Sequence, residues 1–164
     1  MRMKERERSR EFALRVVDQC NFAVLSTADA EGQPYGVALS MVRIGENLYF
    51  HCAREGRKID NLRANAKVSV TCVGNIWFPP DEFTVKYESA VVTGTAEEVT
   101  EEEEWTQAIL ALCRRFTPAK EAEAAGCASG ARAVTAIWKI KIAEITGKCS
   151  PLPEKNESGE VGSL

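Results

Sequence analysis

The chain has 164 residues, a formal net charge of −3 and 45% hydrophobic residues. This length predicts a single domain, with or without tails, that can bury a core without disulfide bridges. The charge argues against a dedicated nucleic-acid-binding protein, which would present a broad basic face, and no apolar run approaches the roughly 20 residues needed to cross a bilayer.

The first predicted element is a helix over residues 9–20. Phe12, Val16 and Cys20 recur every four residues, and Ser9 can cap the helix. The residues before it mix basic and acidic side chains without the continuous apolar stretch of a signal peptide. We therefore expect a cytoplasmic protein with neither a membrane nor a nucleic-acid partner.

Two strands follow, over residues 22–27 and 34–44, with a turn between them that contains Gly32. The second strand has two different faces. Its bulky face consists of Tyr35, Val37, Leu39 and Met41, and its small face consists of Gly36, Ala38 and Ser40. Small residues along one face indicate that something large or flat lies against it, which can be a helix, another sheet or a planar ligand.

Residues 48–62 change from a strand to a helix. Leu48, Phe50 and Cys52 alternate with polar or small residues, as in a half-buried strand, and a helix follows Gly56. Arg57 and Lys58 then stand in its first turn, where the positive end of the helix dipole disfavours cations and attracts anions. The pattern has two interpretations, a solvated basic loop or a phosphate site.

The second half of the chain predicts a strand over 67–73, a loop over 74–82, and a long strand over 83–98 that bends at Gly94. The loop carries Trp77 and Phe78, which either mark an interface or lid or fold back on the core. A helix should begin at Thr100, and a last strand over 133–146 should end at Gly147.

These elements predict a mainly β protein with flanking helices and six strands. Successive antiparallel strands with few intervening helices favour a barrel over a doubly wound sheet. Residues 1–148 form the single predicted domain, and 149–164, rich in polar residues and Gly, are expected to be a disordered tail. The sequence has neither a Gly-x-Gly-x-x-Gly fingerprint nor a P-loop.

The six cysteines include no Cys-x-x-Cys pair, and the chain has one histidine, so we expect no metal site. Cys20, Cys52, Cys72 and Cys113 fall on apolar faces of predicted elements. They are interpreted as buried free thiols, with a catalytic thiol as the alternative.

The order and spacing of seven segments resemble the FMN-binding split-barrel superfamily of pyridoxamine 5'-phosphate oxidase-like proteins, and within it the 5-nitroimidazole resistance flavoproteins. The segments are residues 22–27, 32–40, 48–53, 56–62, 68–72, 87–96 and 140–148. The resemblance implies a six-stranded antiparallel Greek-key split barrel that forms a homodimer, with a flavin in each of two clefts between the subunits.

The resemblance also implies site residues. The flavin ring would lie along Val37, Ala38, Leu39 and Ser40. Its phosphate would be held by the stretch with His51, Cys52, Ala53, Gly56, Arg57 and Lys58, with Asn61 as a further contact. The other subunit would contribute Trp77, Tyr87, Ser89 and Trp138. His51 is the candidate catalytic residue, to touch flavin or substrate or to supply a proton; the alternative is a histidine hydrogen-bonded in the core.

The implied function is a flavin-dependent reductase of small nitroaromatic or quinone-like molecules, with FMN as cofactor and FAD or a deazaflavin as alternatives. Vitamin B6 oxidation is not expected, because no segment matches the one with which true pyridoxamine-phosphate oxidases hold their substrate. The competing functions are a flavin-binding protein without turnover and a haem-binding split barrel with His51 as axial ligand.

Overall fold

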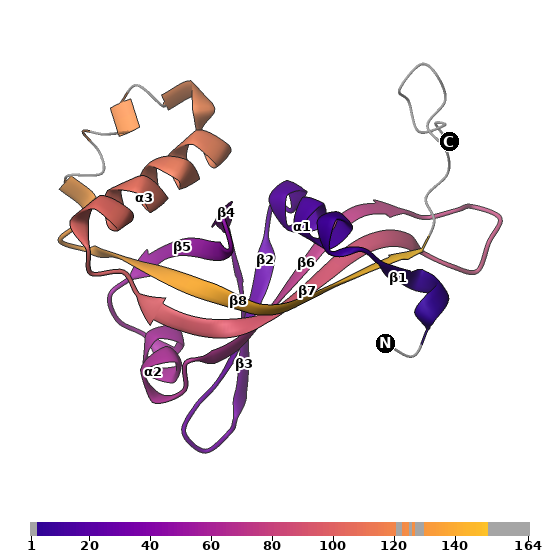
Figure 1. Cartoon of the computed structure of the whole chain (residues 1–164), viewed down its shortest axis with the longest axis horizontal. Helices are drawn as coiled ribbons and strands as arrows, with labels where there is room; N and C mark the ends of the chain where they lie inside the picture. The colour runs from indigo at the N-terminus through magenta and orange to yellow at the C-terminus, as the bar shows by residue number, and fades with distance from the viewer. Residues whose placement is uncertain (1–2, 121–122, 125, 127–129, 151–164) are drawn as a thin grey trace.

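The computed structural model describes residues 3–120, 123–124, 126 and 130–150 of the chain. An antiparallel sheet dominates it, with helices packed around it (Figure 1). Its strands are β1 (Glu7–Arg8), β2 (Ala23–Ala28), β3 (Pro34–Leu39), β4 (Val42–Ile44), β5 (Asn47–Ala53), β6 (Lys67–Trp77), β7 (Lys86–Glu98) and β8 (Thr135–Ser150). The helical elements are η1 (Lys4–Arg6), α1 (Arg10–Gln19), α2 (Arg57–Ala64), α3 (Glu102–Phe116) and η2 (Pro118–Lys120).

The strand order is β3-β2-β6-β7-β8-β5-β4, with β1 added beside β8. The two ends of this path, β3 and β4, are separated in the chain only by Ser40 and Met41. Three Cα steps span at most about 11 Å, so the sheet has to curl until its two edges approach one another. The predicted split barrel is confirmed. The described residues form eight strands instead of six, because the strand predicted over 34–44 breaks at Ser40 and because β1 joins the sheet.

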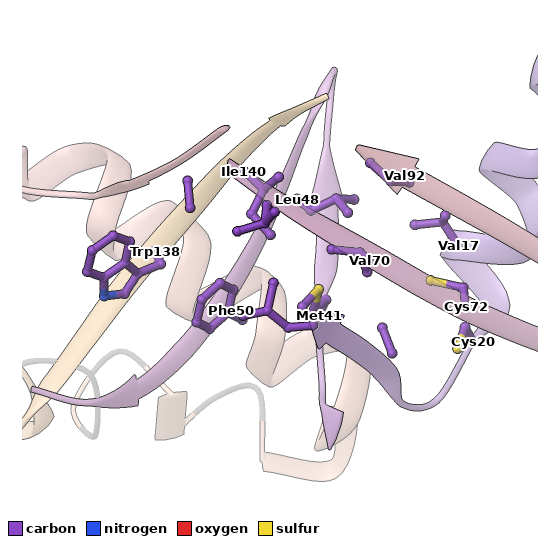
Figure 2. Packing of buried hydrophobic residues seen from close by; sticks show 14 of the residues in the cluster. Val17, Cys20, Met41, Leu48, Phe50, Val70, Cys72, Val92, Trp138 and Ile140 are labelled. Carbon is purple, nitrogen blue, oxygen red and sulfur yellow. The ribbon is translucent and has the colours of Figure 1, made fainter. Parts of the chain in front are cut away.

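The barrel interior is one apolar cluster to which β2, β5, β6, β7, β8 and α1 contribute (Figure 2). Leu48 and Phe50 of β5 point into it, as their alternation predicts. The opposite face of the same strands is buried as well: Tyr49 of β5 and Ile137 of β8 lie beneath α3. β5 and β8 are therefore covered on both faces, which leaves little freedom in the position of α3.

The predicted buried thiols are confirmed for Cys20, Cys52 and Cys72, which are free and buried. Burial raises the pKa of Cys72 to about 12, and the neighbouring Cys20 adds to this effect. A thiol with such a pKa stays protonated at neutral pH and is a poor nucleophile. Cys113 is only half-buried, and Cys127 lies outside the described residues.

Helix α1 closes one end of the barrel. Ser9 caps it as predicted, its Oγ accepting a hydrogen bond from the Phe12 N–H at 3.3 Å. The helix packs against Gly147, where a Cβ atom would lie 3.0 Å from the Phe12 ring and 3.1 Å from the Ala13 Cβ. The prediction that β8 ends at Gly147 was wrong, because this glycine lets α1 approach while the strand continues.

Three other predicted boundaries are corrected. β6 continues to Trp77 instead of ending at residue 73, because it pairs with β7 beyond a register shift, as far as Lys86. β7 begins at Lys86 and not at residue 83. The N-cap of α3 is Glu101 and not Thr100, and no side chain caps this helix. Since β8 extends to Ser150, residues 149 and 150 of the predicted tail belong to the sheet, and 151–164 lie outside the described residues.

None of the helices in the described part of the chain is long and apolar enough to cross a bilayer.

Candidate functional site

Among the strand edges that have no neighbouring strand within the described residues, two carry predicted cofactor residues. β3 pairs only with β2. β5 pairs with β4 only as far as Tyr49, so its edge from Phe50 to Ala53 is open on that side. Open edges present backbone N–H and C=O groups that can pair with a ligand. The predicted cofactor residues on these edges, or on the connection between them, are Val37, Ala38, Leu39, Ser40, His51, Cys52 and Ala53.

Helix α2 begins between the two open edges. Its N-cap, Gly56, has φ of 113°, a left-handed value that favours glycine. The Arg57 guanidinium lies 4.9 Å from the ring centroid of Tyr35 on β3. Lys58 Nζ lies 5.8 Å from the ring centroid of Phe50 on β5. The first turn of α2 thus places one cation beside each open edge.

These two cations have no carboxylate at ion-pair distance among the described residues. Two neighbouring cations do have a carboxylate partner, since Arg54 and Arg63 both approach Glu98, at 3.6 and 3.9 Å. Unpaired cations at a helix N-terminus oppose the helix dipole, and an anion bound there would remove this conflict. Arg57 and Lys58 therefore leave two positive charges without a carboxylate partner at the start of α2.

The small face of β3 is open to solvent. Gly36 and Ala38 are exposed, and they pair directly with Ser26 and Val24 of β2 on the same face of the sheet. On this face of β3, Gly36 and Ala38 present nothing larger than a methyl group. A planar ligand can therefore approach the backbone closely here.

His51 points away from the barrel core, on the same side of β5 as Tyr49. More than a third of the residue is exposed, and no described residue forms a hydrogen bond with its ring. Partial burial of the ring, followed by the positive charge of Lys58, lowers the pKa of His51. The imidazole is therefore neutral at pH 7 and accessible, and the interpretation as a histidine hydrogen-bonded in the core finds no partner in the described part of the chain.

A cavity of about 270 Å³ adjoins His51. Ser40 and His51 line one side of it. The other side consists of Ile109, Leu112, Cys113 and Phe116 of α3 and the following Thr117. The cavity therefore shares two residues with the predicted cofactor site and extends it towards α3.

Asn61 and Trp138 lie inside the fold of this chain. The Asn61 Nδ2 donates a hydrogen bond to Thr27 Oγ1 at 3.0 Å, and both residues are buried, so this bond fastens α2 to β2. Trp138 pairs with Phe50 and packs in the barrel core, 4% exposed. Its indole N–H has no acceptor among the described residues.

The three remaining predicted residues, Trp77, Tyr87 and Ser89, lie on the β6–β7 hairpin. β6 leaves the end of α2 at Lys67, and Trp77 stands ten residues further on, about 33 Å away at the usual strand rise. Figure 1 shows this hairpin at the opposite end of the sheet from α2. One copy of the chain therefore does not bring these residues to the open edges.

The outer face of the sheet has an exposed apolar area. Val24, Val73 and Val91 are 42%, 45% and 39% exposed, and Phe22 beside them is 67% exposed. Val24 and Val91 both pair with Thr71, so they share one face, and this face continues into the small residues of β3. Several exposed apolar side chains on one face of a sheet are typical of an interaction surface.

A family model described as pyridoxamine 5'-phosphate oxidase matches residues 9–149. The chain belongs to this family. The predicted family is thereby confirmed, and the open edges, the basic turn of α2 and the exposed face of β3 all lie within the matched residues. No curated protein matches the chain.

Solved structures share this pyridoxamine 5'-phosphate oxidase-like fold. A candidate 5-nitroimidazole antibiotic resistance protein from Bacteroides thetaiotaomicron is 22% identical, covers 86% of this chain and 84% of its own, and gives a TM-score of 0.71. An FAD-binding protein from Mesorhizobium loti is 23% identical over 89% of this chain and 98% of its own, with a TM-score of 0.67. An FAD and haem binding protein from Mycobacterium smegmatis is 22% identical over 92% and 76%, with a TM-score of 0.72. Identities this low show a shared fold.

The contribution of α3 is what sequence reasoning missed in this family member. The spacing of Trp105, Ile109, Leu112 and Phe116 along the helix predicts a single buried stripe. Trp105, Ile109 and Leu112 are buried, whereas Phe116 is only half-buried. The available signal is that the apolar stripe continues to the last turn of the helix, beyond the part that β5 and β8 cover. Periodicity alone does not distinguish a core side chain from a cavity wall.

Proposed function

We propose that this protein is a flavin-binding oxidoreductase that reduces small nitroaromatic or quinone-like molecules, with FMN as cofactor and FAD as the alternative. The observation that carries the proposal is the first turn of α2, where Arg57 and Lys58 stand unpaired between two open strand edges. The FAD-binding proteins with the same fold add support.

The residues present fit a flavin. Arg57 and Lys58 would hold a phosphate, together with the backbone N–H groups that follow Gly56. The open edge of β3 and its small face would accept the ring system, which needs close approach and backbone hydrogen-bond partners. When bound, a flavin supplies reversible redox chemistry with hydride donors and acceptors. The chain itself binds and orients it, and neutral His51 is placed to exchange a proton at its ring nitrogens.

A second copy of the chain would complete the site. The apolar outer face around Val24, Val73 and Val91 continues into β3, so a partner bound to it would also cover the small face. Because Trp77, Tyr87 and Ser89 lie far from the open edges of their own chain, we infer that they contact the flavin of the partner. Trp138 is buried in the core of its own subunit, so we do not assign it a contact with the partner's flavin.

The absorption spectrum of the purified protein tests the proposal. Flavin bands, bleached by NADH or NADPH without oxygen and restored by a nitroimidazole, are expected. Bleaching without reoxidation by nitroaromatics or quinones would favour a flavin-binding protein without turnover. A Soret band instead would favour haem, for which accessible His51 is the available axial ligand. A protein that takes up no added flavin would exclude the proposal.

The phosphate assignment has its own test. Arg57→Ala with Lys58→Ala should weaken flavin binding by a hundredfold or more, since each charge-assisted hydrogen bond contributes roughly 1.5–3 kcal/mol and about 1.4 kcal/mol is a tenfold change in affinity. Arg63→Ala with Lys67→Ala removes the same charge from the last turn of α2 and the start of β6, and it should leave the affinity within a few-fold. Equal effects of the two double variants would mean that only net charge matters.

A further inference from the structure

The cavity beside His51 has walls of two kinds. Ile109, Leu112 and Phe116 form an apolar wall from one helix. Ser40, His51 and Thr117 bring hydroxyl and imidazole groups to its other surfaces. A cavity with one apolar wall and a few polar groups is typical of a small-molecule site.

Among the described residues, none that lines this cavity carries a formal charge at neutral pH. His51 is the only titratable cation among them, and its lowered pKa keeps it neutral. The nearest cations on α2, Arg57 and Lys58, are the residues to which the proposed function assigns the flavin phosphate. A phosphorylated or carboxylate ligand would therefore find no charged partner in the cavity.

The volume limits the ligand as well. A dry cavity of about 150 Å³ is enough to bind benzene, and sites for drug-sized ligands begin at about 300 Å³. At about 270 Å³ this cavity accommodates one ring with small substituents.

We propose that this cavity is the substrate subsite of the flavoenzyme and that it binds an uncharged, single-ring aromatic molecule, with Leu112 and Phe116 against the ring and Ser40 and His51 beside its acceptor oxygens. The inference rests on the proposed function and makes it more specific. It excludes pyridoxamine 5'-phosphate, the molecule in the family's description, as a substrate, because the cavity offers nothing to pair with its phosphate. Helix α3 thereby determines substrate specificity.

Binding of two matched probes tests this inference. 4-Nitrobenzyl alcohol and 4-nitrobenzyl phosphate share the ring and differ by the charged group. Equilibrium titration of the flavin-loaded protein, followed by the flavin absorption bands, should give a dissociation constant at least tenfold lower for the alcohol. Tighter or equal binding of the phosphate would overturn the inference. Flavin has to be present, because the free cations of α2 would otherwise attract the phosphate.

Cys113→Phe provides the matching variant, because a ring at this position fills the cavity from the middle of its α3 wall. It should weaken binding of 4-nitrobenzyl alcohol at least tenfold with the flavin content unchanged. Gln107→Phe puts the same side chain on the exposed face of α3 and should bind like the wild type. Equal binding by both variants would overturn the inference.

A second variant and a second readout separate this inference from the proposed function. If Cys113→Phe does not fold, Phe116→Ala, which removes the ring contact, should also weaken alcohol binding several-fold, and unchanged binding would overturn the inference. If the protein takes up no flavin, the proposed function fails. In that case, calorimetric titration with 4-nitrobenzyl alcohol still tests whether the cavity binds a neutral ring. The flavin-free wild type and Gln107→Phe should bind the alcohol, and Cys113→Phe should bind it more weakly.

Discussion

Asn61→Ala should weaken the attachment of α2 to the barrel and so disturb the basic turn of the candidate site. The Asn61 side chain is buried, and its amide donates to Thr27 Oγ1 at 3.0 Å. The Thr27 hydroxyl in turn donates to the carbonyl oxygen of Tyr35 at 3.3 Å. This short chain of hydrogen bonds connects α2, β2 and β3, the elements that place Arg57 beside the open edge of β3.

The expected loss is about 1–3 kcal/mol of unfolding free energy. One hydrogen bond between neutral groups contributes about 0.5–1.5 kcal/mol net, and a buried partner left without it raises the cost towards about 3 kcal/mol. For a chain of this length each kcal/mol lowers the thermal midpoint by about 2–4 °C. Flavin affinity should fall less than in the Arg57 and Lys58 double variant, because both cations remain.

Urea unfolding of the flavin-free protein measures this loss, and Thr27→Val completes a double-mutant cycle. The two substitutions should couple by about 0.5–1.5 kcal/mol, since both remove the same bond. Additive effects would refute the hydrogen-bond argument. An Asn61→Ala variant that keeps its full stability without flavin but loses flavin affinity would show instead that Asn61 contacts the cofactor directly.

Three further measurements test other parts of the structure. Gly94→Ala should lower the unfolding free energy by about 2–3 kcal/mol, at the upper end of overpacking effects, because the new methyl carbon would lie 2.2 Å from a backbone carbonyl oxygen of β8. An unchanged urea midpoint would contradict this close approach. In a proton NMR titration, the single imidazole of His51 should titrate below pH 6.5, because partial burial and then the charge of Lys58 disfavour the protonated ring. Lys58→Gln should raise the pKa of His51. A pKa of 6.5 or more in the wild type would indicate a fully solvated ring. The hydrogen bond from Lys139 lowers the pKa of the Glu104 carboxyl below 4.5 in the folded protein. As the pH falls, the unfolded chain therefore takes up a proton at Glu104 before the folded protein does. The stabilisation by this pair is present above pH 4.5 and is lost as the pH falls through the folded pKa. In urea unfolding between pH 7 and 3, Glu104→Gln should make the unfolding free energy fall less steeply as the pH is lowered. An unchanged slope of unfolding free energy against pH would exclude the Lys139–Glu104 pair as a source of this pH dependence.

Local pattern was a reliable guide wherever one face of an element meets the core. The alternation of Leu48, Phe50 and Cys52 predicted which side of β5 is buried, and Gly56 before two cations predicted the start of α2. Both signals are local, because side-chain direction follows from the strand period and because a helix start needs only its own few residues.

Strand ends were less predictable, because a partner strand decides where pairing stops. Gly74 and Gly147 have the local character of breakers, yet β6 runs on to Trp77 and β8 to Ser150, each held by β7. Because Gly147 has no side chain, α1, which comes from a distant part of the sequence, can pack closely against it. No local window contains that contact.

The sequence alone determined the family, the barrel class, the core faces and the basic turn with Arg57 and Lys58, since each depends on residue type and spacing along the chain. Only the tertiary structure decided that the edges of β3 and β5 are open, that α2 begins between them, and that Phe116 of α3 meets His51 across a cavity. The last of these relations joins residues 65 positions apart, from His51 to Phe116, and all of them exist only once the sheet has curled.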